Sequence, residues 1–401
     1  MTSEWHEVPL RELVGYISKG IAPSYAEEAS ESTIRVLNQK CNRNFRISYG
    51  DSRLHDTRKK KVPPERYVKP DDILINSTGA GTAGRIAQIE DVPSATTIDG
   101  HMILIRSNGK VTQKFLGYAL KAHQWEVLQL DEGSTGQTEL NRDRLLDEIM
   151  INYPVSLDEQ TAIVGTLESI DRKLIVNEQL NDNLEQQAQS YFQELFVDNA
   201  SPEWTTGTIS DLGTVVGGST PSKAKPEYYT ESGIAWITPK DLSINKSKFV
   251  SHGENDITEL GLRNSSASLM PEGTVLFSSR APIGYIAIAA GEVTTNQGFK
   301  SVVPKPEIGT PFVYFFLKNT LPVIEGMASG STFKEVSGST MKNVSAVIPD
   351  AETLAKFSDF CAPIFAQQRI LEEQNQSLAT LRDNLLPKLM SGEIDVSAVQ
   401  L

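Results

Sequence analysis

The sequence predicts an α+β fold: two homologous α/β-mixed domains separated by two long antiparallel coiled-coil helices and related by a pseudo-twofold internal repeat. Three observations predict this class. The two halves of the 401-residue chain match in order, each half has short strand-like runs broken by Gly, Pro, Ser and Asn, and each half ends in a long heptad pattern. The expected parts are a first domain at 1–155, a central helix at 156–198, a second domain at 199–349 and a C-terminal helix at 350–395.

The internal repeat rests on a series of matches whose offset stays between 195 and 202. The matching segments, first half with second half, are Glu4-Trp5 with Glu203-Trp204, Leu13 and Pro23-Ser24 with Leu212 and Pro221-Ser222, 34–40 with 234–240, 70–75 with 271–277, 84–87 with 284–287, Thr96-Thr97 with Thr294-Thr295, Gly133-Ser134-Thr135 with Gly330-Ser331-Thr332, and Pro154 with Pro349. Matches in a constant order indicate a duplicated domain.

Each domain is expected to contain several short strands and one short helix. The strand-like runs are 73–75, 102–105, 274–277 and 285–289, and the helices are expected around 115–130 and 312–327. The long helical segments follow at 157–197 and 357–389, and each is too long to bury its apolar stripe against one small domain. We therefore expect the two helices to pair with each other, although core helices of a single larger fold are the alternative.

The seam of the helix pair is predicted from steps that alternate between four and three residues. Its predicted members are Ile163, Leu167, Ile170, Leu174, Asn177, Asn181, Leu184 and Leu195 in the first helix, and Ile364, Leu371, Asn375, Leu378, Leu385 and Leu389 in the second. Asparagine in a seam costs stability but can fix the register. Pro363 is expected to kink or delay the second helix, and Pro387 and Gly392 are expected to close it.

Charge is segregated along the chain, although the net charge of −13 argues mildly against nucleic-acid binding. Residues 35–69 hold eleven basic and three acidic residues, whereas residues 157–197 hold eight acidic and two basic residues. The basic run at 58–61 could also be a solvated loop. The two cysteines and five histidines are scattered, so neither a disulfide nor a metal site is expected. Without a signal sequence or an apolar span of about 20 residues, the expected location is the cytoplasm.

Motif analysis assigns no catalytic, cofactor-binding or metal-binding residue to this chain. Residues 79–84 match the dinucleotide pattern GxGxxG, but a strand-like run follows where that motif requires a helix, and the repeat copy lacks two of the glycines. The better interpretation is a tight strand-loop-strand connection. No phosphate-binding GxxxxGK[ST] loop occurs, and no adenine-methyltransferase tetrad is present.

The chain resembles the specificity subunit of type I restriction-modification systems over essentially its whole length. The resemblance rests on the domain order and on sequence motifs typical of that family. These motifs lie at residues 218–222, 234–242, 278–284 and 295–300 in the second half, and at 154–160, followed by Ile163, Val164 and Leu167, in the first. The first domain departs further from these motifs than the second domain does. The second long helix lacks the Glu159-Gln160 pair found in the first long helix. The exact start of the second helix is therefore open.

The resemblance implies a non-catalytic subunit that reads a bipartite, asymmetric target in double-stranded DNA. It implies one half-site for each domain, a gap set by the helices, and docking of two methyltransferase and two restriction subunits. S-adenosylmethionine, ATP and Mg would belong to those partners, with no cofactor on this chain. The alternatives are a coiled-coil scaffold without a DNA role and a stand-alone DNA-modifying enzyme.

Candidate DNA contacts are basic and polar residues near the strand-loop-strand connections and in the basic stretch. In the first domain they are Lys40, Arg43, Arg46, Arg58, Lys59, Lys60, Asn76, Ser77, Thr78 and Arg85, and in the second Lys223, Lys225, Thr238, Lys240, Ser278, Ser279, Arg280 and Lys334. Trp5, Trp204 and Trp236 are expected to anchor cores rather than stack on bases. The acidic Glu178, Asp182 and Glu185 are expected on a partner-facing surface.

Overall fold

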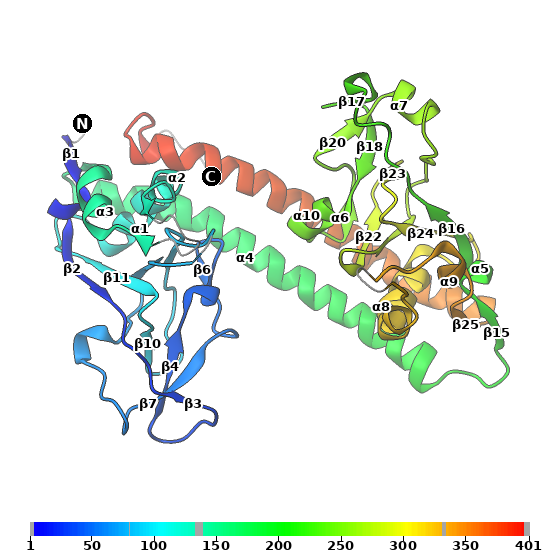
Figure 1. The fold of residues 1–401 in the computed structure, drawn as a ribbon, viewed down its shortest axis with the longest axis horizontal. Coiled ribbons are helices and arrows are strands. Elements are labelled where there is room, and N and C mark those ends of the chain that lie inside the picture. Colours follow the sequence, from blue (N-terminus) through cyan, green and yellow to red (C-terminus); the bar gives the residue numbers. More distant parts are fainter. Residues whose placement is uncertain (1–3, 80, 133–138, 331–333, 397–401) are drawn as a thin grey trace. The chain divides into compact units, whose positions relative to one another are not determined.

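The computed structural model describes residues 4–79, 81–132, 139–330 and 334–396, and its contacts divide the chain into two units (Figure 1). Unit 1 comprises Met1–Lys173 and Leu378–Leu401, and unit 2 comprises Leu174–Ser377. Each unit therefore contains one mixed domain together with a part of each long helix. The repeated Gly-Ser-Thr segments at 133–135 and 330–332 fall largely outside the described residues.

Unit 1 contains short strands and three short helices. The strands are β1 (Trp5–Pro9), β2 (Val14–Lys19), β3 (Tyr25–Ala26), β4 (Thr33–Leu37), β5 (Asn42–Arg43), β6 (Arg46–Ile47), β7 (Arg53–Asp56), β8 (Ile73–Asn76), β9 (Ile86–Gln88), β10 (Thr96–Ile98), β11 (Met102–Ser107), β12 (Asp131–Glu132), β13 (Glu139–Leu140) and β14 (Met150–Pro154), and the helices are α1 (Gln113–Ala122), α2 (Gln124–Val127) and α3 (Arg142–Glu148). Its main sheet has the order β2-β11-β8-β9, and a second sheet has the order β10-β4-β7-β3.

Unit 2 is built in the same way. Its strands are β15 (Thr205–Thr208), β16 (Gly213–Gly217), β17 (Tyr229–Thr230), β18 (Ile234–Ile237), β19 (Phe249–Val250), β20 (Asn255–Ile257), β21 (Val275–Ser279), β22 (Ile283–Ala289), β23 (Thr294–Thr295), β24 (Lys300–Pro304) and β25 (Ser345–Ile348), and its short helices are α5 (Ile209–Leu212), α6 (Pro239–Ile244), α7 (Glu259–Arg263), α8 (Thr310–Gly326) and α9 (Gly338–Lys342).

Sheet topology confirms the internal repeat. The unit 2 sheets have the orders β16-β24-β21-β22-β19 and β17-β20-β18-β23, which match the two unit 1 sheets strand for strand except for the added edge strand β19. The parallel pairs also correspond, because β10 pairs with β4 in unit 1 and β23 pairs with β18 in unit 2. The terminal ladders β1-β14 and β15-β25 complete the correspondence.

Each main sheet is buried on both faces, which explains its uninterrupted apolar runs. On β8, Ile73 and Ile75 join a core with the helices, while Leu74 joins a core with the second sheet. On β21, Phe277 packs toward the helices and Leu276 packs toward the second sheet. Side chains alternate across a strand, so a strand between two cores needs apolar residues at every position.

The two long helices are α4 (Leu157–Gln193), which continues into a π-helical turn at Glu194–Asp198, and α10 (Ala351–Met390). In unit 1, Leu167 of α4 and Leu389 of α10 belong to one core. In unit 2, the Asn177 side chain donates a 2.9 Å hydrogen bond to Asn375 Oδ1. Residue numbers fall along α10 as they rise along α4 within each unit, so the predicted antiparallel pairing is confirmed.

The predicted seam residues are buried or half-buried in both units. In α4, Ile163, Ile170 and Leu174 are buried, and Leu184 and Leu195 pack partly buried against the unit 2 core. In α10, the buried predicted members are Ile364, Leu371 and Leu389, and the half-buried ones are Leu378 and Leu385. The seam changes character along its length: it is apolar in unit 1 and polar around Asn177, Asn181 and Asn375 in unit 2.

The expectation of a late start at Pro363 is wrong. Helix α10 begins at Ala351 and continues through Pro363 and Pro387 to Met390. Both prolines are exposed, so the carbonyl that each leaves without a helical partner lies on the face that water can reach. Gly392 follows the helix end with a φ of +75°, a conformation that suits glycine.

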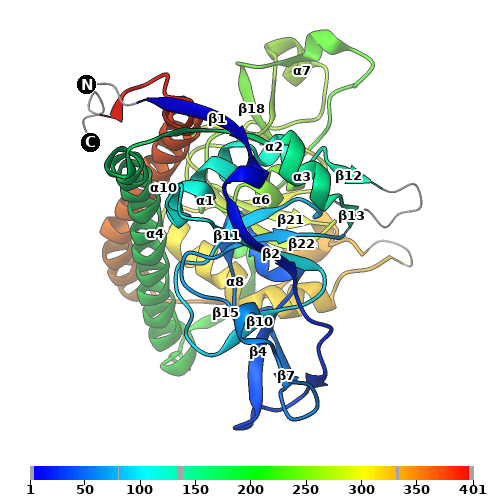
Figure 2. The same ribbon diagram turned by 90° about the vertical axis from the view of Figure 1, so that its left-hand side faces the viewer.

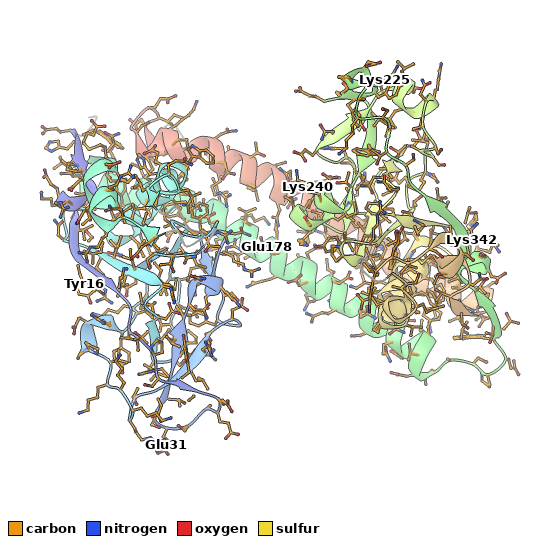
Figure 3. The ribbon with its side chains drawn as sticks, viewed as in Figure 1. Tyr16, Glu31, Glu178, Lys225, Lys240 and Lys342 are labelled. Carbon is orange, nitrogen blue, oxygen red and sulfur yellow. The ribbon has the colours of Figure 1, made fainter. Side chains whose placement is uncertain are left out.

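The acidic residues of α4 do not form one surface. Glu178 and Asp182 are exposed, and Glu178 is labelled in Figure 3. Glu185 instead bonds to Lys248 and Lys318 with its side chain only 21% exposed, so its expected place on a partner-facing surface is wrong. The sequence could not show this because both lysines come from distant segments.

The tryptophans named as core anchors take that role. Trp5 packs on the unit 1 core and Trp204 on the unit 2 core, while Trp236 is buried and donates a 3.0 Å hydrogen bond to the Ser219 carbonyl. Within the described ranges, no helix combines the length and apolar composition needed to span a bilayer.

Candidate nucleic-acid interface

The strand-loop-strand connection predicted from the sequence is present in both units. In unit 1, β8 and β9 are antiparallel and are joined by residues 77–85, and in unit 2, β21 and β22 are antiparallel and are joined by residues 280–282. We call these connections the tips. The dinucleotide interpretation of residues 79–84 fails because β9 occupies the place where that motif requires a helix. Ala80 of that motif lies outside the described residues.

A glycine in or next to each tip permits a close approach of the following helical segment. A Cβ on Gly84 would lie 2.9 Å from the Val127 carbonyl oxygen, and one on Gly284 would lie 2.6 Å from Leu321 Cδ1. The Gln124 side chain also bridges the unit 1 tip, since its Nε2 donates to the Gly84 carbonyl (2.8 Å). A helical segment of the same unit therefore packs against each tip.

Four candidate contact residues at the strand ends are buried. Asn76 donates to the Gln39 carbonyl (3.1 Å), and the Ser77 hydroxyl donates to the Gly100 carbonyl (3.5 Å). The Ser278 hydroxyl donates to the Pro282 carbonyl (2.8 Å), and the Ser279 hydroxyl donates to the Gly298 carbonyl (3.1 Å). All four side chains are fully covered, so they shape the tips and are not among the exposed contact candidates.

Five of the unit 1 candidates are exposed cations of the basic stretch. Lys40, Arg43, Arg58, Lys59 and Lys60 are exposed. Arg58 contacts Asp56 (3.4 Å), and the Lys60 ammonium donates to the Ala22 carbonyl (2.9 Å).

The remaining unit 1 candidates are half-buried. Arg85 donates to the Gly81 carbonyl (3.1 Å), and the Thr78 hydroxyl lies 2.7 Å from His101 Nδ1. Arg46 is also half-buried, on β6. The sequence did not single out His101, which lies at the start of β11 beside this tip.

The unit 2 candidates occupy separate places, as the labelled Lys225 and Lys240 show in Figure 3. Lys225 is 3.8 Å from Glu227, and Lys240 is 2.5 Å from Glu254. Lys223 and Lys334 are exposed. Thr238 caps α6 by accepting from the Asp241 N–H (3.4 Å), so its role is structural.

Arg280 lies on the unit 2 tip and contacts Glu335. Its Nη1 lies 3.4 Å from Glu335 Oε2, and Lys300 Nζ lies 3.6 Å from Oε1 of the same carboxylate. In unit 1, Lys19 forms an ion pair with Glu139. The sequence analysis named neither glutamate nor their lysines. The available signal was that Glu139 and Glu335 follow the glycines of the repeated Gly-Ser-Thr segments by similar distances, six and five residues.

The described residues contain no cluster of His, Cys, Asp or Glu suited to a metal ion. A depression in unit 2 is lined partly by Asp211, Lys305 and Glu307, but the Asp211 carboxylate already accepts from the Thr208 N–H (2.8 Å). Cys41 and Cys361 are buried thiols in different units, and burial raises the pKa of Cys361 to about 12. That thiol is therefore protonated at neutral pH.

Two copies of one mixed domain, each with a polar and basic tip, define a duplicated recognition protein. The chain belongs to the family described as the type I restriction modification DNA specificity domain, which matches residues 2–186 and 202–381. The two matches cover both units and much of both long helices.

Individual relatives agree with this family. The chain is 38% identical over 191 residues to the type I restriction enzyme MjaIX specificity subunit of Methanocaldococcus jannaschii, covering 45% of this chain and 44% of that relative. It is 27% identical over 194 residues to the HindI specificity subunit of Haemophilus influenzae, covering 48% of this chain and 42% of that relative. These alignments thus span under half the length of each relative.

The fold is also similar to a known structure. The S subunit of a type I restriction-modification system from M. genitalium aligns with a TM-score of 0.59 and 16% identity, covering 97% of this chain and 96% of that one. At this identity the similarity concerns the fold alone.

Proposed function

We propose that this chain is the DNA sequence-specificity subunit of a type I restriction-modification complex and that it reads a bipartite, asymmetric target. The observation that carries the proposal is the duplication. Two domains of one topology each present a tip beside exposed or half-buried cations, and two similar but non-identical reading domains suit a target with two different halves.

The differences between the tips support the asymmetry of the target. The unit 2 tip carries Arg280, whereas the corresponding position in unit 1 is Thr78, because each pairs with the equivalent glutamate in a backbone bridge. Arginine and threonine offer different hydrogen bonds to base edges. The two half-sites would therefore differ in sequence.

The shared helices are proposed to set the gap between the half-sites and to dock the partner subunits. Residues 157–197 carry a net charge of −6, which disfavours contact with phosphates. Exposed residues such as Glu178 and Asp182 would then face protein. Two methyltransferase and two restriction subunits would supply catalysis, S-adenosylmethionine, ATP and Mg, while this chain would act without a cofactor.

Domain exchange tests the proposal. Residues 1–155 would be replaced by the first domain of a related specificity subunit, and the host methylome would be sequenced with the original chain, with the chimera and without either. We expect one methylated bipartite motif that requires the chain, and in the chimera a change confined to one half of it. A simultaneous change in both halves would contradict independent reading domains.

Two assays separate the alternatives. If the purified chain methylated DNA with S-adenosylmethionine and no partner, it would be a stand-alone enzyme. If its complex with a methyltransferase subunit showed no preference within a random duplex pool, the scaffold alternative would gain. We expect weak, salt-sensitive binding by the chain alone and sequence-specific binding by the complex.

A further inference from the structure

We propose that Arg280 reads a guanine in the half-site of unit 2 and that Glu335 is the positioning residue that reserves it for a base rather than a phosphate. The inference rests on the proposed function, since it assigns a base contact within the same target. It follows from the placement of a carboxylate beside the tip in both units and beside the Arg280 cation in unit 2.

The first step is that Glu335 holds its place through the backbone. The N–H of Val336 donates to the Ser279 carbonyl (3.0 Å), and Glu335 forms bridges with both Arg280 and Ser329. The carboxylate is therefore fixed beside the tip by main-chain pairing, not only by its contact with the guanidinium.

Unit 1 repeats this arrangement. There the N–H of Leu140 donates to the Ser77 carbonyl (2.8 Å), and Glu139 forms a bridge with Thr78. Glu139 and Glu335 are 196 positions apart, within the offset range of the repeat. The same carboxylate thus stands at the same place on both tips.

Each carboxylate also has a lysine, but the two lysines come from opposite strands. Lys19 is on β2 opposite Ile103 of β11, whereas Lys300 is on β24 opposite Gly217 of β16. These are the equivalent end pairs of equivalent ladders. In both units, a lysine at this end pair of strands contacts the glutamate beside the tip, although the lysine comes from a different strand in each unit. This indicates that the ion pair between the lysine and the glutamate has been retained.

The geometry leaves Arg280 able to bind a further acceptor. Glu335 uses one oxygen for Arg280 and the other for Lys300, and the Lys300 side chain is only 16% exposed. Within the described part of the chain, the contacts of the Arg280 guanidinium with Glu335 involve Nη1. Nε–H and an Nη2–H lie together on one edge of a guanidinium, and that edge matches the O6 and N7 acceptors of guanine.

The neighbouring carboxylate decides between a base and a phosphate. A phosphate is an anion and is repelled by Glu335 at short range, whereas a guanine edge is neutral and is not. Glu335 therefore weakens sequence-independent binding while it leaves the base contact intact. Without it, Arg280 would be a mobile cation suited to any phosphate.

The test uses the full chain in complex with its methyltransferase partner, the selected target duplex and a random duplex. Arg280→Lys keeps the charge but not the bidentate fork. We expect it to relax the guanine preference at one position of the unit 2 half-site by roughly tenfold to a hundredfold, with random-duplex binding nearly unchanged.

Glu335→Gln tests the positioning role. We expect binding to the random duplex to rise roughly fivefold at low salt, with a slope of log K against log salt steeper by about one, and the preference at the same guanine to fall. Glu259→Gln is the matched control, because it removes the same charge from an exposed ion pair with Arg263 in unit 2. It should leave both readouts unchanged.

Several outcomes would overturn the inference. These are equal weakening on all sequences by Arg280→Lys, an equal effect of Glu259→Gln and Glu335→Gln, or a Glu335→Gln variant whose specificity and salt slope match the original. A changed preference at some other position would instead make Glu335 a reader itself. Absence of any sequence preference in the original complex would overturn the proposed function, which is a distinguishable result.

Discussion

The two units attach to the long helices through the same type of buried carboxylate but support it differently. In unit 1, Asp171 of α4 accepts from the Tyr118 hydroxyl (2.8 Å) and the Lys121 ammonium (3.2 Å), both on α1, and Figure 2 shows α1 beside α4. Arg382 of α10 completes this site at 3.2 Å.

In unit 2, the carboxylate is Glu185 of α4. It accepts from the Tyr314 hydroxyl (3.2 Å) and from Lys318, both on α8. The further cation is Lys248, which precedes β19 and lies 2.5 Å from Glu185. In both units, a helix of the domain (α1 or α8) therefore supplies a tyrosine and a lysine. The third partner is Arg382 of α10 in unit 1 and Lys248 of the domain in unit 2.

The carboxylates are not equivalent in the repeat. At the offset of 195 given by Pro154 and Pro349, where the helical segments begin, Asp171 corresponds to Ala366 and Glu185 corresponds to Thr380. Helix α4 supplies the anion in both units, whereas α10 supplies an amide or a guanidinium at the facing position. The duplicated helices have thus diverged into complementary partners, which favours the pairing of α4 with α10 over the pairing of like helices.

Unit 2 has an additional attachment that has no counterpart among the described residues of unit 1. Glu372 of α10 accepts from the backbone N–H groups of Lys248 (2.7 Å) and Phe249 (3.0 Å) at the start of β19. In unit 1, the parallel contact in the equivalent place is a single bridge between Phe45 and Ala87. The unit 2 attachment is also less exposed to solvent. The side chain of Lys248 is 5% exposed, whereas that of Lys121 in unit 1 is 11% exposed.

The largest expected effect comes from removing the two carboxylates separately. Glu185→Gln should lower the free energy of unfolding of unit 2 by about 3–5 kcal/mol, because it leaves Lys248 charged and buried. Asp171→Asn should cost unit 1 less, about 1–3 kcal/mol, since Arg382 retains Asp383 at 2.8 Å.

Hydrogen exchange in increasing urea, resolved by peptide, measures the two units separately in the full chain. Asp182→Asn, an exposed change on the same helix, is the control and should have little effect. Equal losses in the two units would break the comparison.

Acid should act on the same two sites. Burial would raise the pKa of Glu185, but Lys248 and Lys318 lower it below its usual value. Burial would likewise raise the pKa of Asp171, but Lys121, Tyr118 and Arg382 lower it. A carboxyl with a lowered folded-state pKa stabilises the protein above its unfolded pKa of about 4, and this contribution is lost as the pH falls through the folded value.

We therefore expect both units to lose protection below a pH of about 4. Glu185→Gln should flatten this pH dependence in unit 2 alone, and Asp171→Asn should flatten it in unit 1 alone. Hydrogen exchange across a pH series, corrected for intrinsic exchange rates, gives the result. An unchanged acid profile in either variant would assign the acid sensitivity to other groups.

The smallest effect concerns the polar seam of unit 2. Asn177 Oδ1 is buried without a hydrogen-bond partner among the described residues, and the Asn177–Asn375 bond costs stability relative to an apolar pair. The double variant Asn177→Leu/Asn375→Leu should raise the free energy of unfolding of unit 2 by about 1 kcal/mol. Asn177→Leu alone should not, because it leaves Asn375 without its donor.

Urea midpoints compare the variants. A gain from the double variant without a gain from the single variant would show that the polar pair, rather than either asparagine, sets this cost. Destabilisation by both would indicate that the hydrogen bond contributes net stability.

The sequence predicted the elements well because they depend on local periodicity. Heptad steps predicted residues such as Leu167 and Leu389, and the strand-like runs predicted β8, β11, β21 and β22. Pro363 was misjudged because the cost of a helical proline depends on whether its side of the helix is exposed, which the period alone does not show.

Side-chain roles at the tips were harder to predict because they depend on distant segments. Ser278 and Ser279 are small and polar, as contact residues often are, but both are buried, and their hydroxyls donate to the carbonyls of Pro282 and Gly298. No sequence motif marks Lys248 as a buried residue. Its burial follows from its contacts with Glu185 and Gln368, which are distant in the sequence. Arg280 could be identified from the sequence because it lies on the connection between two strand-like runs, next to the repeated segment 284–287. Its pairing with Glu335 became apparent only in the structure.

Within unit 1, Trp5 of β1 contacts Gly392, which follows α10. A Cβ on Gly392 would lie 2.9 Å from Trp5 Cε2, so β1 and the segment after α10 meet in unit 1. Two segments that are distant in the sequence, 1–173 and 378–401, therefore belong to the same unit. A permuted gene that joined these ends and opened the exposed connection at 199–203 would encode the same contacts in a different linear order.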